Sequence, residues 1–120
     1  MILLYHNPDS TESNECLRFL KRVKQKYRII KYIEKPLTER KIKRIVRLLD
    51  IKPIELIRTE DEIWRKHFKD IVKDESDFED IEYIKMMAEF PKLIQVPIVI
   101  KGNKAIIAKP PIKVLDIILD

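Results

Sequence analysis

Hydrophobic residues at the start of the chain change spacing twice within about 30 residues, and each spacing predicts one element. The apolar run at 2–5 is typical of a buried strand. From Ser10 to about Gln25 apolar residues recur at helical spacing, with Ser10 or Ser13 as the candidate N-cap. The β-branched stretch at 28–32 then predicts a second strand. A strand, a helix and a strand in so short a span predict a parallel βαβ unit.

The middle of the chain is predicted to be helical. Thr38 is expected to cap one helix, Pro53 to open a short one, and Asp77 to cap another that stops before Pro91. The apolar positions of these segments are Ile42, Ile45, Val46 and Leu49, then Ile63, His67, Phe68 and Ile71, and finally Phe78, Ile81, Ile84, Met87 and Ala88.

The last quarter of the chain returns to strand spacing before a final helix. A buried strand at 97–100, a turn at 101–104 and a strand at 105–108 predict an antiparallel hairpin. Pro110 and Pro111 are expected to start the last helix. Its inward positions are predicted to be Ile112, Leu115, Ile118 and Leu119. The whole order predicts an α/β fold, βαβ then ββα, with a helical insertion between the second and third strands.

Composition sets the outer limits of the prediction. A chain of 120 residues, 45% hydrophobic and 38% charged, fits one folded domain, residues 1–120, with a helical subdomain at about 36–91. The single glycine excludes a Gly-rich phosphate loop, and the single cysteine excludes an internal disulfide. Two distant histidines give no metal signature, so no metal or other cofactor is expected. Without a long apolar run or a leader-like start, we expect a cytoplasmic protein with no membrane partner.

Three short motifs, in this order and spacing, carry a resemblance to a known family. They are Tyr5-His6-Asn7-Pro8, Val96-Pro97-Ile98-Val99 and Val114-Leu115-Asp116-Ile117. With them the chain resembles the ArsC-like arsenate reductases and their relatives, the Spx regulators. The resemblance implies a thioredoxin-like fold in which Pro97, at the start of the third strand, is a cis-proline.

The same resemblance indicates that the family's oxyanion chemistry is altered. Ser10 stands where the family has its nucleophilic cysteine, and a serine hydroxyl cannot complete a cycle that needs a thiolate and a resolving thiol. Arg58 matches the family's first oxyanion-binding arginine. The second is replaced by Val96 and the third by Lys109. The anion-binding candidates are therefore Ser10, Arg58 and Lys109.

Ser10 lies where the first predicted strand leads into the first predicted helix. The other residues of this loop do not restore that chemistry. In the Spx branch a Cys-x-x-Cys switch stands where this chain has Ser10 and Ser13, so a disulfide switch is excluded. Asp9 and Glu12 add negative charge that opposes an incoming anion. Cys16 is interpreted as a buried packing residue rather than a replacement nucleophile. His6 is interpreted as a structural hydrogen-bonding residue of the loop.

Basic residues gather on two predicted helices, at Arg18–Lys24 and Arg40–Arg47. They could meet nucleic acid or an acidic protein, but no nucleic-acid-reading motif accompanies them. A solvated face is the preferred interpretation, and no direct nucleic-acid partner is expected.

Three functions are compatible with these residues. We expect a non-catalytic binding or regulatory module, with RNA polymerase as the partner that resemblance to Spx implies. The alternative is a glutaredoxin- or glutathione-dependent arsenate reductase that uses Cys16 or external thiols. The third possibility is that the Ser10 loop binds phosphate, sulfate or arsenate without reducing it.

Overall fold

A computed structural model describes residues 1–119 of the chain, which group into two compact units. The sheet unit comprises Met1–Lys35 and the chain from Val96 onward, and the helical unit comprises Pro36–Gln95. None of the helices within residues 1–119 has the length and apolar character needed to span a bilayer.

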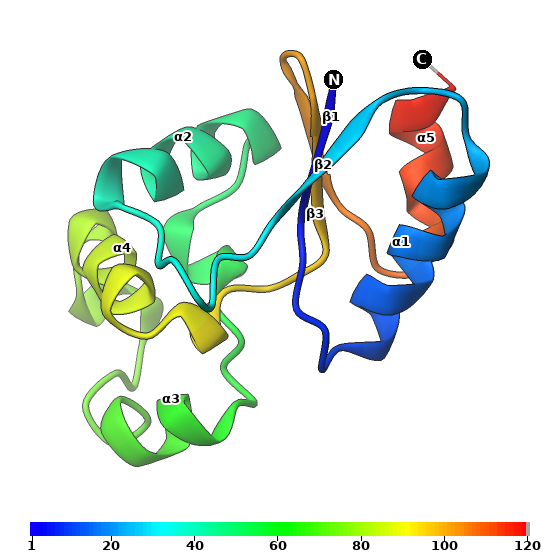
Figure 1. Cartoon of the computed structure of the whole chain (residues 1–120). Coiled ribbons are helices and arrows are strands. Elements are labelled where there is room, and N and C mark those ends of the chain that lie inside the picture. Colours follow the sequence, from blue (N-terminus) through cyan, green and yellow to red (C-terminus); the bar gives the residue numbers. More distant parts are fainter. Residues whose placement is uncertain (120) are drawn as a thin grey trace. The chain divides into compact units, whose positions relative to one another are not determined.

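The sheet unit contains a four-stranded mixed sheet with the order β2-β1-β3-β4 (Figure 1). The strands are β1 (Ile2–Tyr5), β2 (Tyr27–Ile30), β3 (Ile98–Lys101) and β4 (Lys104–Ile107). β2 is parallel to β1, as predicted, whereas β3 is antiparallel to β1 and to β4. The turn between β3 and β4 contains Gly102 at φ 61°, a left-handed backbone that glycine adopts without steric cost.

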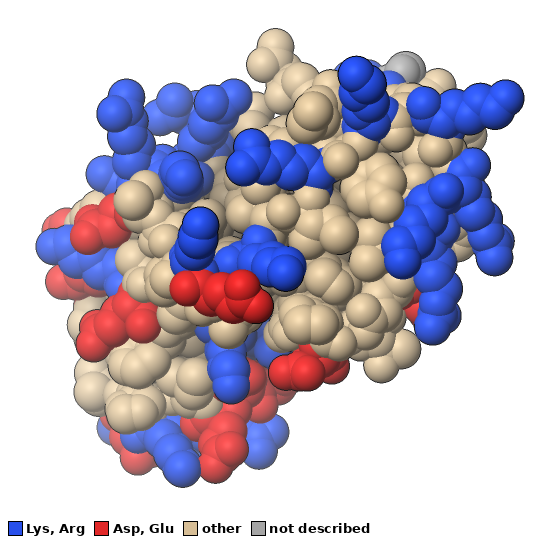
Figure 2. All heavy atoms as spheres, viewed as in Figure 1, with Lys and Arg blue, Asp and Glu red and all other residues tan. Residues whose placement is uncertain are grey.

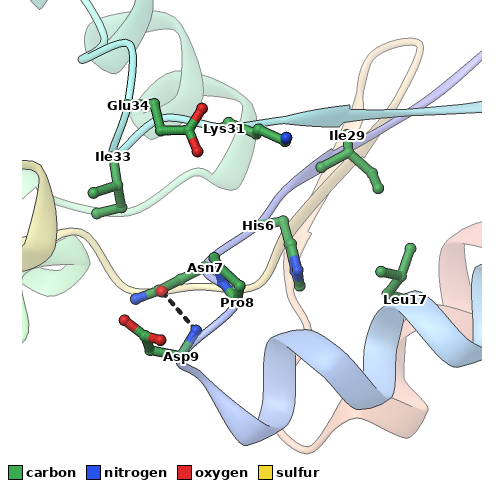
Figure 3. A pocket seen from close by; sticks show the side chains of 9 residues that line it. All are labelled: His6, Asn7, Pro8, Asp9, Leu17, Ile29, Lys31, Ile33 and Glu34. Atoms are coloured by element: carbon green, nitrogen blue, oxygen red, sulfur yellow. Dashed lines mark hydrogen bonds between the residues drawn. The ribbon is translucent and has the colours of Figure 1, made fainter.

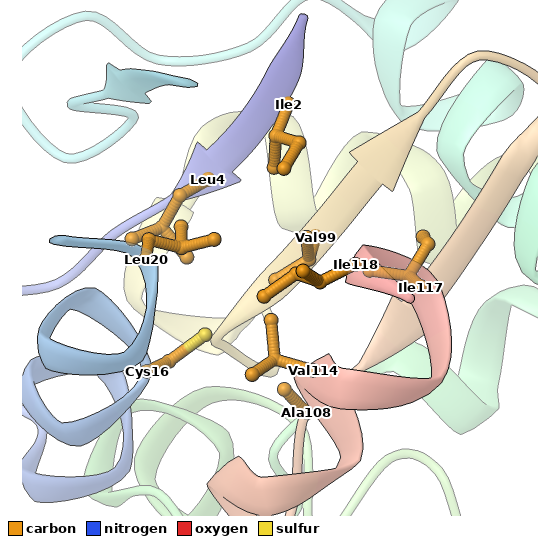
Figure 4. Packing of buried hydrophobic residues seen from close by; sticks show 9 residues of the cluster. All are labelled: Ile2, Leu4, Cys16, Leu20, Val99, Ala108, Val114, Ile117 and Ile118. Carbon is orange, nitrogen blue, oxygen red and sulfur yellow. The ribbon is translucent and has the colours of Figure 1, made fainter. Parts of the chain in front are cut away.

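Two helices, α1 (Thr11–Arg22) and α5 (Leu115–Ile118), lie on one face of this sheet (Figure 1). Between them and the sheet is an apolar core (Figure 4). Its buried members are Ile2, Leu4, Cys16, Leu20, Val99, Ala108, Val114, Ile117 and Ile118. The core therefore joins the first and last thirds of the sequence and fixes α1 against β1.

The helical unit is built from α2 (Glu39–Leu49), α3 (Glu62–His67) and α4 (Asp80–Glu89), with short 3-10 turns between them. Thr38 caps α2 as predicted, because its hydroxyl accepts the Lys41 N–H at 3.2 Å. The predicted short helix at Pro53 is confirmed as a 3-10 turn, Pro53–Leu56.

Three details of the helical prediction are wrong. α3 ends at His67, and Ile71 is 59% exposed rather than part of a buried face. Asp77 does not cap α4. Its carboxylate accepts the N–H groups of Lys73 and Asp74 and closes the preceding turn, so Phe78 lies before a helix capped at Glu79.

The final helix also differs from its prediction. The segment Pro111–Val114 is a 3-10 turn, and only Leu115–Ile118 is α-helical. Ile118 is buried as predicted. Because a 3-10 turn repeats every three residues, the other inward positions are Pro111, Val114 and Ile117. Ile112 and Leu119 are exposed instead, and Leu115 is only partly buried.

This assignment predicts that two leucines of the sheet unit differ sharply in their effect on stability. Leu20→Ala should lower the free energy of unfolding by roughly 2 to 5 kcal/mol, because it opens a cavity in the core. The matched variant Leu119→Ala should change it by less than about 0.5 kcal/mol, since that side chain is 80% exposed. Urea unfolding measures both. Similar losses in the two variants would contradict the assigned register of the C-terminal segment.

Candidate functional site

One end of the sheet collects the segments that carry the predicted site residues. β1 and β2 both end there, and Tyr5 of β1 is paired with Ile98, the first residue of β3. Ile98 is in turn paired with Ile107, the last residue of β4. The loop that contains Ser10, the Val96–Pro97 peptide and Lys109 therefore share this end of the sheet. The Val96–Pro97 and Lys109–Pro110 bonds are both cis.

The loop after β1 is organised around the hydroxyl group of Ser13, which is fully buried. Ser13 Oγ accepts the Asn7 N–H at 3.1 Å and lies 2.5 Å from His6 Nδ1. One side chain in the first turn of α1 thus holds the two residues that follow β1. Because the core fixes both β1 and α1, the loop between them has little freedom to change shape.

Ser10 acts as the N-cap of α1. Its hydroxyl oxygen accepts the Ser13 N–H at 3.2 Å, and its hydroxyl donates to a Glu12 carboxylate oxygen at 3.3 Å. The Ser10 hydroxyl therefore donates one hydrogen bond and accepts one, both with residues of the first turn of α1.

The backbone N–H groups of the loop are also engaged within it. Those of Asp9 and Ser10 donate to the side-chain and main-chain oxygens of Asn7, at 2.9 and 3.0 Å. Together with the N–H groups of Asn7 and Ser13, four donors of the strand-to-helix junction already have acceptors in the loop. An anion that used any of these four donors would first have to displace its present acceptor.

His6 is a neutral imidazole in this arrangement. Burial lowers the pKa of His6, and the positive charges of Lys21 and Lys31 lower it further. The Ser13 hydroxyl accepts the Asn7 N–H, so its own proton can be donated to His6 Nδ1. Nδ1 is then the acceptor nitrogen, and we assign the imidazole proton to Nε2. The predicted structural role of His6 agrees with this geometry.

Beside the loop, the sheet unit has a pocket of about 340 Å³ (Figure 3). Its apolar wall comes from β2 and α1, and its polar groups come from the loop and from the segment after β2. The residues that line it are His6, Asn7, Pro8, Asp9, Leu17, Ile29, Lys31, Ile33 and Glu34. Its charged lining residues are Asp9, Lys31 and Glu34, so the lining is mixed in charge rather than cationic.

The other anion-binding candidates are placed differently. Lys109 follows β4 in the sheet unit, whereas Arg58 belongs to the helical unit. The guanidinium of Arg58 lies 3.7 Å from a Glu60 carboxylate oxygen and 3.5 Å from one of Asp61. Its positive charge is therefore partly compensated. Val96, at the predicted arginine position, is buried.

Residues 5–117 match the sequence profile of the ArsC family. The chain belongs to the ArsC family. It is 33% identical over 118 residues to an arsenate reductase from Haemophilus influenzae, with 98% of each chain covered. It is 29% identical to the uncharacterised protein YfgD of Escherichia coli, over 98% of this chain and 96% of that one. A solved arsenate reductase structure from Vibrio cholerae superposes with a TM-score of 0.86 at 29% identity, covering 97% of this chain and 96% of that chain. The α/β fold predicted from the sequence is thus confirmed.

Cys16, the one thiol of this ArsC-family chain, lies in the core rather than in the loop. Burial raises the pKa of Cys16 to about 12. At neutral pH the side chain is a protonated thiol packed among apolar residues, as predicted.

Sequence reasoning missed the central role of Ser13, which it considered only as a possible helix cap. The Asn7-Pro8 pair is a turn signal, because asparagine side chains accept backbone N–H groups two residues later, as Asn7 does here from Asp9. Nothing in the residue pattern distinguished Ser13 from the other hydroxyl groups nearby. Its importance depends on burial, which the spacing of single polar residues does not reveal.

Residues 1–119 contain no group of three or more His, Cys, Asp or Glu side chains suited to hold a metal ion.

The lowered pKa of His6 predicts a specific loss of stability in mild acid. The unfolded state binds a proton as the pH falls through about 6.5, whereas folded His6 resists protonation, so unfolding becomes more favourable below that pH. His6→Gln should flatten this part of the stability curve, measured by urea unfolding between pH 7.5 and 5. His67→Gln removes the other histidine and is measured in parallel, so that the effect at His6 can be compared with that of an identical substitution elsewhere. A His6→Gln curve parallel to that of the unmodified protein would refute the assignment.

The burial of Cys16 predicts a thiol that is unreactive in the folded protein. At pH 8 only about one molecule in ten thousand would carry the thiolate. A thiol-directed reagent such as iodoacetamide, followed by mass spectrometry, should modify Cys16 only in denaturant. The double variant Ser10→Cys/Cys16→Ser moves the thiol to the loop and should react without denaturant. Rapid modification of native Cys16 would show that the thiol is accessible after all.

Proposed function

We propose that this ArsC-family protein is a non-catalytic binding or regulatory module rather than an oxyanion reductase. The observation that carries the proposal is the use of Ser10, which stands where resemblance places the nucleophilic cysteine. Its hydroxyl caps α1 and contacts Glu12, so it is part of the loop's own hydrogen bonding. A reductase would need a thiolate at this position, available to attack the substrate.

No other group in the sheet unit supplies that thiolate. Cys16 is in the core, with a pKa near 12. Reduction of the oxyanion takes two electrons, which two thiols supply when they join in a disulfide. External thiols can supply these electrons, but the family's cycle begins with attack by a protein thiolate, and Cys16 is not available for that attack.

The charges around the loop also support a role other than oxyanion reduction. Asp9 is exposed beside the helix N-terminus, where the helix dipole would otherwise attract an anion. Arg58 has Glu60 and Asp61 as partners in the helical unit, and Val96 provides no charge. Each of these residues weakens an interaction on which oxyanion chemistry depends.

The proposal predicts no arsenate reduction above the uncatalysed background. The assay would follow NADPH consumption in the presence of glutathione, glutaredoxin and glutathione reductase. The unmodified protein and Cys16→Ser should both be inactive, because neither has a thiolate in the loop.

The same assay can overturn the proposal. Turnover by the unmodified protein that disappears in Cys16→Ser would make Cys16 the nucleophile and the protein a reductase. Calorimetric titration with arsenate, phosphate or sulfate tests whether the loop binds an oxyanion without reducing it. Heat of binding at millimolar anion would show that it does.

The partner that resemblance to the Spx regulators suggests is RNA polymerase. Purified polymerase from the source organism, immobilised and challenged with this protein, would test that partner directly. Retention on the polymerase, but not on a matched surface without it, is the supporting result. No retention at micromolar protein would remove polymerase as the partner while leaving the reductase question to the assay above.

A further inference from the structure

The exposed side of α2 in the helical unit carries a hollow lined almost entirely by cations. The lining residues are Thr38, Arg40, Lys41, Lys43, Arg44 and Arg47, and we call this set the α2 basic face. The opposite side of the helix is apolar, since Ile42, Ile45 and Val46 are buried. Figure 2 shows Lys and Arg side chains gathered over α2 at the upper left. Burial of the apolar side therefore fixes the direction in which the cations point.

Five like charges on one side of a helix work against folding. Arg40 and Arg44, like Lys43 and Arg47, are four residues apart, a spacing at which like charges repel by roughly 0.2 to 0.5 kcal/mol per pair. None of the ion pairs found within residues 1–119 involves a member of this face. The chain has 20 acidic residues, yet none of them lines the hollow. The structure thus leaves this positive charge to be neutralised from outside.

The lining of the hollow indicates what kind of anion would fit. Protein partners are usually held by apolar or aromatic anchors in pockets, and this hollow has no apolar or aromatic lining residue. Arginine and lysine without such anchors are typical of contacts to phosphate groups, where the guanidinium can bind two oxygens at once.

The length of the face matches a run of phosphates. From Arg40 to Arg47 the helix advances about 10 Å, at 1.5 Å per residue. Each strand of duplex DNA presents one phosphate per about 3.4 Å of the axis, so about three phosphates of one strand lie within that length. Five cations on the face are therefore enough to pair with each of them.

We propose that the α2 basic face binds the phosphodiester backbone of nucleic acid without reading its sequence. The residue pattern alone favoured a solvated face, because charge by itself does not distinguish the two cases. The structure adds the shared hollow, the missing ion pairs and the absence of apolar lining. The lack of a nucleic-acid-reading motif agrees with binding to the backbone only. This inference is independent of the chemistry of the Ser10 loop.

The test measures fluorescence anisotropy of the full chain with two labelled 20-bp duplexes of unrelated sequence, between 50 and 200 mM salt. Both duplexes should bind with equal affinity, with Kd in the range of about 1 to 100 µM near physiological salt. Three to five phosphate contacts predict a slope of log K against log salt of about −3 to −4.5. Arg44→Gln/Arg47→Gln should reduce the slope by about 2 and weaken binding by at least roughly tenfold at 100 mM salt.

A matched variant separates this face from general attraction by a basic protein. Arg18→Gln/Arg22→Gln removes the same charge from exposed positions of α1 and should leave affinity within about twofold. Lys41→Gln/Lys43→Gln provides a second test of the face if the arginine double variant folds poorly. Circular dichroism and thermal unfolding check each variant.

Three results would overturn the proposal. The first is no binding at 50 mM salt, and the second is equal weakening by the α1 and α2 double variants. The third is displacement of the duplex by poly-glutamate at a charge concentration far below that of competing unlabelled DNA. That outcome would identify an acidic polypeptide, not nucleic acid, as the preferred partner.

Discussion

The hydroxyl group of Ser13 is the point on which the geometry of the sheet unit's loop depends. It receives the Asn7 N–H and lies against His6 Nδ1, although it belongs to the helix that follows. A fully buried hydroxyl must satisfy its hydrogen bonds within the protein, since an unpaired one would cost about 1 to 3 kcal/mol. Conformations of the loop that keep both bonds are therefore favoured by about this amount. This constraint also makes His6 a neutral acceptor, because an imidazolium would have no lone pair at Nδ1 to offer the hydroxyl proton.

The same constraint decides what the loop can do chemically. A strand-to-helix junction is an anion site only when its N–H groups are free to turn toward a ligand. In this chain four of those groups already have acceptors within the loop, which are oxygens of Asn7, Ser10 and Ser13. Membership of the ArsC family fixes the scaffold, but the scaffold does not determine the reaction. The side chains at the junction do, and here they are directed toward each other.

The sequence predicted those parts of the structure in which a residue's local pattern and its tertiary environment agree. α2 is such a case, because its apolar period, the Thr38 cap and the buried side of the helix all coincide. The C-terminal segment is not, because Pro111 begins a 3-10 turn whose shorter repeat reverses which residues face the core. Asp77 has the residue type of a helix cap, yet its carboxylate is used by the turn before it. In both places a competing local structure, invisible to a count of apolar positions, shifted the register by a few residues.

The distribution of charge distinguishes the sites that the resemblance suggests from the α2 basic face, and this difference sharpens the functional argument. In the sheet unit, carboxylates of Asp9 and Glu34 reach the pocket beside the loop, and in the helical unit Glu60 and Asp61 contact Arg58. Acidic side chains therefore stand beside two of the places that the resemblance suggests for an anion, the loop and Arg58. The α2 basic face has the reverse arrangement, with five cations and no carboxylate in the lining. A net charge of +5 does not by itself say where an anion would bind. The pairing of each cation with nearby carboxylates is more informative. An anion gains the most Coulomb energy where its positive partners have not already been neutralised.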